Sequence, residues 1–122
     1  MFVVFSQEMK GLYATPTLMH QLVGVRPDGS TVQVSGLSTG TADQLYIALR
    51  VASVLEYLDR APTLPFITDD LFINFDDERA TAGFKVLSQL AEKTRVIFFT
   101  HHRHLVEIGQ RSFGSSVSGI SL

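Results

Sequence analysis

Cysteine is missing from this chain of 122 residues. Its absence excludes disulfide bonds and thiolate metal sites, and it fits a reducing cytoplasm. An excess of one charge is also missing, because ten basic side chains stand against twelve acidic ones and the formal charge is −2. The chain therefore shows no overall footprint of a nucleic-acid-binding surface, and any contact with DNA would be local or made by another part of the protein.

Long apolar runs are missing as well. The N-terminal MFVVFSQE is short and has no basic leader, so it lacks the pattern of a signal peptide, and no run approaches the length of a membrane span. We therefore expect a soluble, cytoplasmic protein without a membrane contact. A hydrophobic content of 45% predicts one domain, 1–122, that buries roughly two-thirds of the surface of its unfolded chain.

Residues 21–35 have the pattern of a β-hairpin. LVGV (22–25) and TVQV (31–34) are rich in β-branched residues, and the RPDGS between them carries a Pro-Asp-Gly turn signal. Residues 1–20 are harder to interpret. We expect one short strand there, at Phe2–Phe5, and assign the segment no function.

A long helix is predicted over Ala42–Leu58. The small polar stretch GLSTGT precedes it, and Thr41 with Gln44 fits a capping box, so the helix should begin directly after Gly40. Apolar residues lie on almost every side of this helix, a pattern that is typical of a buried one.

Two strands and two further helices are predicted after it. LPFIT (64–68) and RVIFFT (95–100) are continuous apolar runs of the kind found in buried parallel strands. Between them the pattern indicates an amphipathic helix over Asp77–Lys93, and HHRHLVEIG should begin another that ends at Gly109. The inward side chains expected on the first of these helices are Ala80, Phe84, Leu87, Leu90 and Ala91. This order predicts an α/β fold with a right-handed βαβ unit in a parallel sheet and flanking helices.

Acidic side chains follow the first of these strands. Asp69 and Asp70 are adjacent, and because like charges repel, we expect a positive partner such as a divalent cation beside them. A solvated pair or a helix cap is the simpler alternative. The carboxyl ends of parallel strands meet at one edge of a sheet, so Thr100 and His101 should lie near the two aspartates.

The GLSTGT stretch is a second candidate site. Its small residues let backbone amides approach an anion at the start of a helix, although an ordinary capped turn has the same composition. Together with the carboxylates it predicts a metal-phosphate substrate. The run His101, His102 and His104 makes a zinc site conceivable, but its spacing does not place all three rings on one side, so His102 or His104 is expected on a helix surface.

Three segments resemble the motifs of ABC-type ATPases, in the form found in the SMC, RecN and YhaN-like branch. LSTGTADQLYIALRVA is similar to the signature segment, PFITDDLFINFD to the Walker B strand followed by the D-loop, and VIFFTHH to the switch-histidine strand. They stand in the family order over roughly residues 22–105. The resemblance implies a partial ABC-type ATPase head, with residues 36–122 forming the lobe that carries these motifs.

The resemblance implies a role for each matching residue. Asp69 would hold Mg²⁺ through water, Asp70 would polarise the attacking water, and His101 would contact the γ-phosphate of ATP. Asp70 departs from the pattern, because many members have Glu there, and the side chain is one methylene shorter. The shorter carboxylate is therefore expected to hold the attacking water less well or to need a closer dimer.

Other matching residues are implied to act across a dimer interface. Ser38 and Gly40 would meet the γ-phosphate of a nucleotide held by the opposite subunit, and Asp76 would be the D-loop aspartate that crosses between subunits. Thr39 and Thr41 are milder departures from the family pattern. The implied partners are a second head, in a homodimer, and DNA through the full-length protein.

The phosphate loop of these enzymes, G-x-x-x-x-G-K-[ST], has no match here. The lysines are Lys10, Lys85 and Lys93, and none follows a glycine. The chain is therefore expected to be the C-terminal lobe alone, inactive until an N-terminal Walker A lobe is supplied in cis or in trans.

The leading hypothesis is a lobe of an SMC-like ATPase that uses ATP and Mg²⁺ in DNA repair or chromosome maintenance. The alternatives are a non-catalytic assembly lobe and a stand-alone Mg²⁺-dependent phosphohydrolase.

Overall fold

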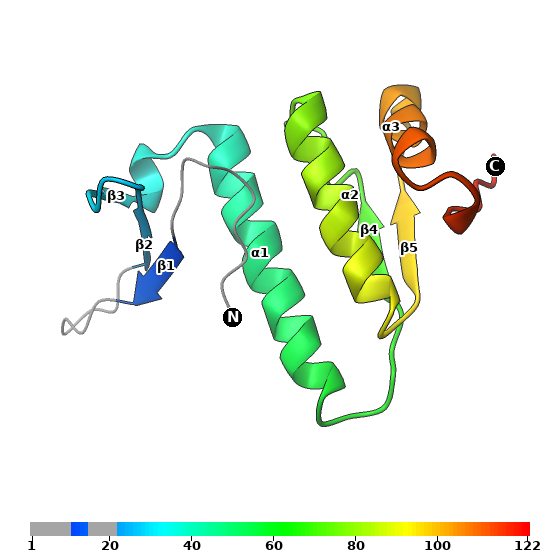
Figure 1. Cartoon of the computed structure of the whole chain (residues 1–122), viewed down its shortest axis with the longest axis horizontal. Helices are drawn as coiled ribbons and strands as arrows, with labels where there is room; N and C mark the ends of the chain where they lie inside the picture. Colours follow the sequence, from blue (N-terminus) through cyan, green and yellow to red (C-terminus); the bar gives the residue numbers. More distant parts are fainter. Residues whose placement is uncertain (1–10, 15–21) are drawn as a thin grey trace. The chain divides into compact units, whose positions relative to one another are not determined.

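The computed structural model describes residues 11–14 and 22–122, and they divide into two compact units that meet in the chain between Ala52 and Ser53 (Figure 1). The strand expected at Phe2–Phe5 lies outside the described residues. That residues 1–122 form a single domain stays a prediction.

The first unit contains a three-stranded antiparallel sheet. β1 (Gly11–Ala14) pairs with β2 (Leu22–Val25), and β2 pairs with β3 (Thr31–Gln33), which confirms the predicted hairpin. β1 was not predicted, because residues 1–20 carry no clear strand pattern beyond Phe2–Phe5. A short 3₁₀ turn, Val34–Gly36, follows the sheet.

The turn of the hairpin is closed by local hydrogen bonds. The Arg26 N–H donates to the Ser30 carbonyl over 2.8 Å, and the Ser30 N–H donates to the Asp28 carboxylate, also over 2.8 Å. Gly29 has a φ of +86°, a conformation that favours glycine. The Pro-Asp-Gly signal thus correctly predicted which residues form the turn.

Helix α1 (Thr39–Leu58) begins earlier than expected. Ser38 precedes its first turn: its Oγ accepts from the Thr41 N–H over 3.3 Å, and its carbonyl accepts from the Ala42 N–H over 2.9 Å. The predicted start after Gly40 and the Thr41–Gln44 capping box were therefore wrong, because Ser38 supplies the cap.

Burial along α1 is uneven. Leu45, Ile47 and Val51 are buried, whereas Leu49 and Tyr57 are 43% and 45% exposed. The expectation of a helix buried all round was thus correct only for one side of its N-terminal part.

The second unit is a βαβ unit followed by a helix. β4 (Phe66–Asp69) and β5 (Val96–Phe99) pair in parallel, with α2 (Asp77–Ala91) between them in sequence and α3 (Arg103–Phe113) after them. A 3₁₀ turn, Gly114–Ser116, follows α3. Helix α2 lies against one face of the two strands, and α3 lies beside α2 (Figure 1). The predicted α/β class with a parallel βαβ unit is confirmed.

Aromatic rings fill the space between sheet and helix. Phe72 is fully buried, and its ring centroid lies 5.3, 5.0 and 5.4 Å from those of Phe75, Phe84 and Phe98. Gly83 of α2 permits this packing, because a Cβ there would lie 2.6 Å from the Phe72 ring. Phe72 is therefore a core residue.

The other face of the β4–β5 sheet is open. Ile67 and Phe99 are 59% and 46% exposed, and the register places Ile67 beside Ile97 and Asp69 beside Phe99. Because side chains alternate along a strand, these residues share the face opposite Phe98. The apolar character of these two strands therefore does not mean that both of their faces are buried among the described residues.

Two predicted helix ends were also wrong. Helix α2 ends at Ala91 and not at Lys93, the predicted end. Ala91 is exposed, although it was expected to face inward. Helix α3 continues through Gly109, which is buried with Phe84 within van der Waals reach, and stops before Gly114, whose φ is +50°. Gly109 thus allows α3 to pack against Phe84, and Gly114 ends the helix.

Among the described residues, no helix is both long and apolar enough to cross a membrane.

Candidate functional site

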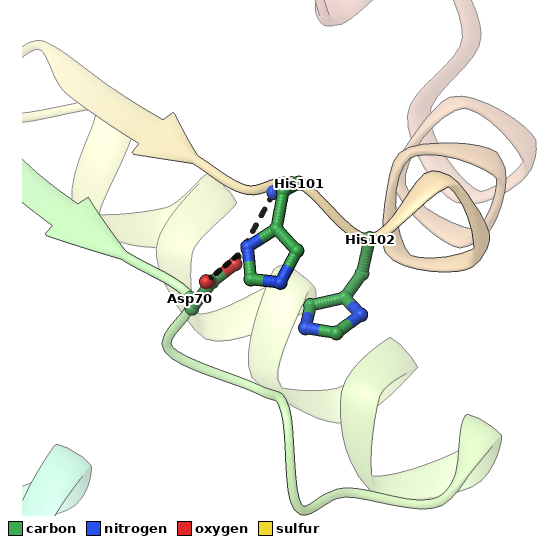
Figure 2. A group of neighbouring side chains, drawn as sticks. All are labelled: Asp70, His101 and His102. Atoms are coloured by element: carbon green, nitrogen blue, oxygen red, sulfur yellow. Dashed lines mark hydrogen bonds and ion pairs between the residues drawn. The ribbon is translucent and has the colours of Figure 1, made fainter.

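Asp70 leaves the end of β4 in an unusual backbone conformation. Its φ is +47°, and among the described residues no other non-glycine residue has a positive φ. Its N–H still donates to the Phe99 carbonyl over 2.9 Å, so the strand pairing extends to this residue. Asparagine and aspartate tolerate the left-handed region better than most residues. The turn directs the Asp70 carboxylate toward the end of β5 (Figure 2).

Three groups from the segment after β5 hold this carboxylate. The Thr100 hydroxyl donates to Oδ1 over 2.8 Å, and the His101 N–H donates to the same oxygen over 3.3 Å. His101 Nδ1 lies 2.6 Å from Oδ2 (Figure 2). The expectation that Asp70, Thr100 and His101 meet at one edge of the sheet is confirmed.

These contacts favour the ionised form of Asp70. The hydrogen bond from the Thr100 hydroxyl is the largest cause that lowers the pKa of this carboxyl, and the His101 N–H and the two imidazoles lower it further, against an opposing effect of burial. Asp70 is consequently a carboxylate at neutral pH.

His102 belongs to the same cluster. Its N–H donates to the Thr100 hydroxyl oxygen over 3.1 Å, and its ring centroid lies 4.0 Å from that of His101. His102 Nε2 is buried and has no hydrogen-bond partner among the described residues. His102 directly precedes α3, and the sequence spacing gave no sign that its ring turns toward Asp70.

His104 is separate from this cluster. It lies in the first turn of α3, and its Nε2 contacts Asp77 Oδ1 at 2.7 Å. The expectation that one of His102 and His104 occupies a helix surface therefore holds for His104, whose side chain is 60% exposed.

Asp69, the predicted Mg²⁺ ligand, is exposed as the last residue of β4. The register puts it on the open face beside Phe99, whereas Asp70 turns toward Thr100 and His101. The structure thus brings Asp70 and His101 together but does not include Asp69 in their contacts.

The predicted interface residues lie at helix starts. Asp76 is the N-cap of α2: its Oδ1 accepts from the Arg79 N–H over 2.8 Å, and its Oδ2 lies 3.4 Å from Arg79 Nε. Ser38 Oγ, besides capping α1, lies 2.8 Å from Thr41 Oγ1, and Gly40 lies in the first turn of the same helix. Capping is therefore an established task of Asp76 and Ser38, whatever else they bind.

Comparison with known proteins first defines the class of the fold. The described chain resembles the SMC head domain from Thermotoga maritima, with a TM-score of 0.59 and 19% identity, over 88% of this chain and 36% of that one. The fold is therefore that of part of an SMC head domain, which agrees with the fold that the motifs implied.

The amino-acid sequence is similar to that of one known bacterial protein. The chain is 39% identical over 79 residues to the uncharacterized protein YhaN of Bacillus subtilis (strain 168). The match covers 64% of this chain and 8% of YhaN, so the chain corresponds to a small piece of that protein. No family model matches the chain. The chain is thus similar to part of an SMC head domain in fold and to a segment of YhaN in sequence.

Proposed function

We propose that this chain is the C-terminal lobe of an SMC-like ATPase head that hydrolyses ATP with Mg²⁺ at the interface of two heads. The contact between Asp70 and His101, at the carboxyl ends of two parallel strands in a fold of this class, carries the proposal. Action in DNA repair or chromosome maintenance, contact with DNA through the rest of the protein, and a cytoplasmic location remain parts of the hypothesis.

The side chains suit the chemistry of phosphoryl transfer. Mg²⁺ prefers oxygen ligands, and the exposed Asp69 carboxylate at the end of β4, which lies outside the contacts of Asp70, is of the type that this ion takes. When bound, Mg²⁺ would neutralise charge on the phosphates. Asp70, kept ionised by Thr100, would orient the attacking water, and His101 would donate to a phosphate oxygen.

The exposed sheet face supports the need for a second lobe. Parallel sheets are normally covered on both faces, yet Ile67 and Phe99 are exposed here and β4 pairs only with β5 among the described strands. A lobe that packs on this face would also approach Asp69, which lies on the same side. We propose that this lobe brings the phosphate loop that the chain lacks.

The role of Asp70 can be tested in a complemented head. The chain is combined, by fusion or by mixing, with a phosphate-loop lobe from a YhaN-like protein, and steady-state phosphate release from Mg-ATP is measured. Asp70→Asn should reduce turnover at least about 100-fold while ATP binding is retained, because the amide cannot accept a proton from water. Unchanged turnover in Asp70→Asn would disprove the assigned role.

A matched control removes the same charge nearby. Glu78 lies in the first turn of α2, is exposed, and is not among the predicted site residues, so Glu78→Gln serves as this control. It should leave turnover within about twofold of the unmodified head, since surface substitutions of this kind have small effects.

One observation favours a second candidate, a non-catalytic assembly lobe. Both oxygens of Asp70 are already engaged, Oδ1 by Thr100 and the His101 N–H and Oδ2 by the His101 ring. A carboxylate that remains so engaged would not hold water. Nucleotide-dependent dimerisation of the complemented head without any phosphate release would identify this second function.

A further inference from the structure

Asp70, His101 and His102 form a compact group of metal-ligating side chains. Each offers one donor atom, and these atoms all lie within 4.8 Å of one another. Figure 2 shows the two imidazole rings beside each other, with the carboxylate on the far side of His101. Thr100 holds both ends of the group, because its hydroxyl donates to Asp70 and accepts from the His102 N–H. The group is therefore positioned before any ligand arrives.

His102 points independently to a ligand. Its Nε2 is buried and has no hydrogen-bond partner among the described residues, although buried polar atoms in folded proteins nearly always have one. Gln44 Nε2 and Thr68 Oγ1 are also buried without a partner among the described residues, but an amide nitrogen and a neutral hydroxyl are not usual ligands of a transition metal. An imidazole nitrogen in this position can be satisfied by a metal ion.

We propose that Asp70, His101 and His102 bind a divalent transition-metal ion of the Zn²⁺ type. Two imidazoles and one carboxylate suit Zn²⁺ and its neighbours, whereas Mg²⁺ and Ca²⁺ prefer oxygen ligands alone. Three protein ligands leave a fourth position for water or an anion, as in catalytic zinc sites. This goes beyond the zinc site that the histidine run alone made conceivable, because the third ligand is Asp70 and not His104.

Metal binding requires the donor atoms to shift from their present separations. Donor atoms around a tetrahedral zinc ion lie about 3.3 Å apart when each bond is about 2.0 to 2.1 Å long. The Asp70–His101 pair is closer than this, at 2.6 Å, and the group as a whole spans no more than 4.8 Å. His101 can turn to adjust, because its side chain is 74% exposed. The positive end of α3 opposes a cation here, and the ionised Asp70 offsets it.

The proposed site needs only this chain, so it does not rest on ATP hydrolysis. It shares Asp70 and His101 with the proposed nucleotide site, so zinc would compete with the phosphate chemistry if both exist. Binding of the metal alone is therefore the cleaner measurement.

The test is titration of the chain with Zn²⁺ in competition with a chromophoric chelator. We expect one tight site per chain, weakened at least about tenfold by His101→Ala and by His102→Ala, because each removes one of three ligands. His104→Ala is the matched control, since it removes a neighbouring histidine that contacts Asp77 instead. It should leave the affinity unchanged.

Further readouts keep the test decisive. Circular dichroism verifies that each variant is folded, and if His102→Ala unfolds, the exposed His101→Ala decides. Co²⁺ in place of Zn²⁺ should give the visible absorption of a four-coordinate site, and a millimolar excess of Mg²⁺ should not displace it. Equal Zn²⁺ affinity in the unmodified chain and His101→Ala, or an equal loss in His104→Ala, would overturn the proposal.

Discussion

Asp70 combines a strained backbone with a fully engaged side chain. Its positive φ turns the chain out of β4, and Thr100 and His101 then bind its carboxylate. Strain of this kind costs on the order of 1 kcal/mol or more, and it tends to persist where function requires the conformation. The backbone conformation of Asp70 thus determines where its carboxylate lies in the candidate site.

The titration of Asp70 should reveal its contact with Thr100. We predict that its pKa lies below the ordinary aspartate value and that Thr100→Val raises it, because the hydroxyl donor is lost. Carboxyl ¹³C chemical shifts measured against pH give this midpoint. Asp28 is an internal reference, since its pKa is lowered by Ser30 in the hairpin turn and should not respond to Thr100→Val. An Asp70 midpoint that does not move would contradict the assigned hydrogen bond.

The same shift fixes the sign of a pH effect on stability. A carboxyl whose pKa is lowered by folding stabilises the fold fully above its unfolded pKa of about 3.9, and this contribution is lost as the pH falls through the folded pKa. Urea unfolding at a series of pH values should show a smaller acid-dependent loss of stability in Asp70→Asn than in the unmodified chain. An identical acid dependence would mean that Asp70 contributes nothing to it.

Sequence reasoning reached part of the site at this scale. The rule that parallel strands end at a common edge was sufficient to place Asp70 beside Thr100 and His101. The same rule could not give the directions of the Asp69 and His102 side chains. Those depend on a left-handed turn at residue 70 and on the hydrogen bond between the His102 N–H and Thr100, which no local pattern encodes.

At the scale of elements, single residues fix the starts of the helices. Asp76 caps α2 with its carboxylate, and Ser38 caps α1 with its hydroxyl. The segment that resembles a D-loop singled out Asp76 without indicating this task, and the pattern-based start of α1 fell three residues late because Thr41 fits the same capping rule as Ser38. A sequence that offers two capping residues in one turn does not by itself say which one is used.

Removing the cap of α2 should lower stability. Asp76→Ala is predicted to reduce the free energy of unfolding by about 1 kcal/mol, whereas Asp76→Asn, which retains a capping oxygen, should change it little. Urea unfolding compares the two. An equal effect of both substitutions would indicate that the charge of Asp76, rather than its cap, stabilises the helix.

Two buried glycines provide a matched pair for the packing of α2 and α3. A Cβ on Gly83 would lie 2.6 Å from the Phe72 ring, but a Cβ on Gly109 would lie 3.5 Å from that of Phe84. Gly83→Ala should therefore lower the free energy of unfolding by about 1 to 3 kcal/mol through overpacking. Gly109→Ala should leave it unchanged or raise it by up to about 1 kcal/mol, as alanine favours a helix. Equal effects in thermal or urea unfolding would contradict this packing.

At the scale of the whole molecule, the central feature is an incomplete sheet. Among the described strands, β4 and β5 form a pair with one apolar face open, an arrangement that a parallel sheet rarely tolerates in isolation. The two runs are continuously apolar, a pattern that is common in strands buried on both faces. Among the described residues, α2 packs against one face of the pair, and the other face is exposed.

The open face should make the isolated chain associate with itself. We predict concentration-dependent association in sedimentation velocity, reduced in the Ile67→Ser, Phe99→Ser double variant because its apolar contact is removed. Val106→Ser, a single exposed apolar substitution on α3, is the control and should not reduce association. A clean monomer at all concentrations would count against an uncovered interface.

The most direct test of the account compares ATP turnover by the chain, by a YhaN-like phosphate-loop lobe, and by the two combined. The account predicts no phosphate release from Mg-ATP by either part alone and measurable release by the combination. Turnover by the chain alone would contradict it, because the chain would then not need a second lobe to complete its nucleotide site.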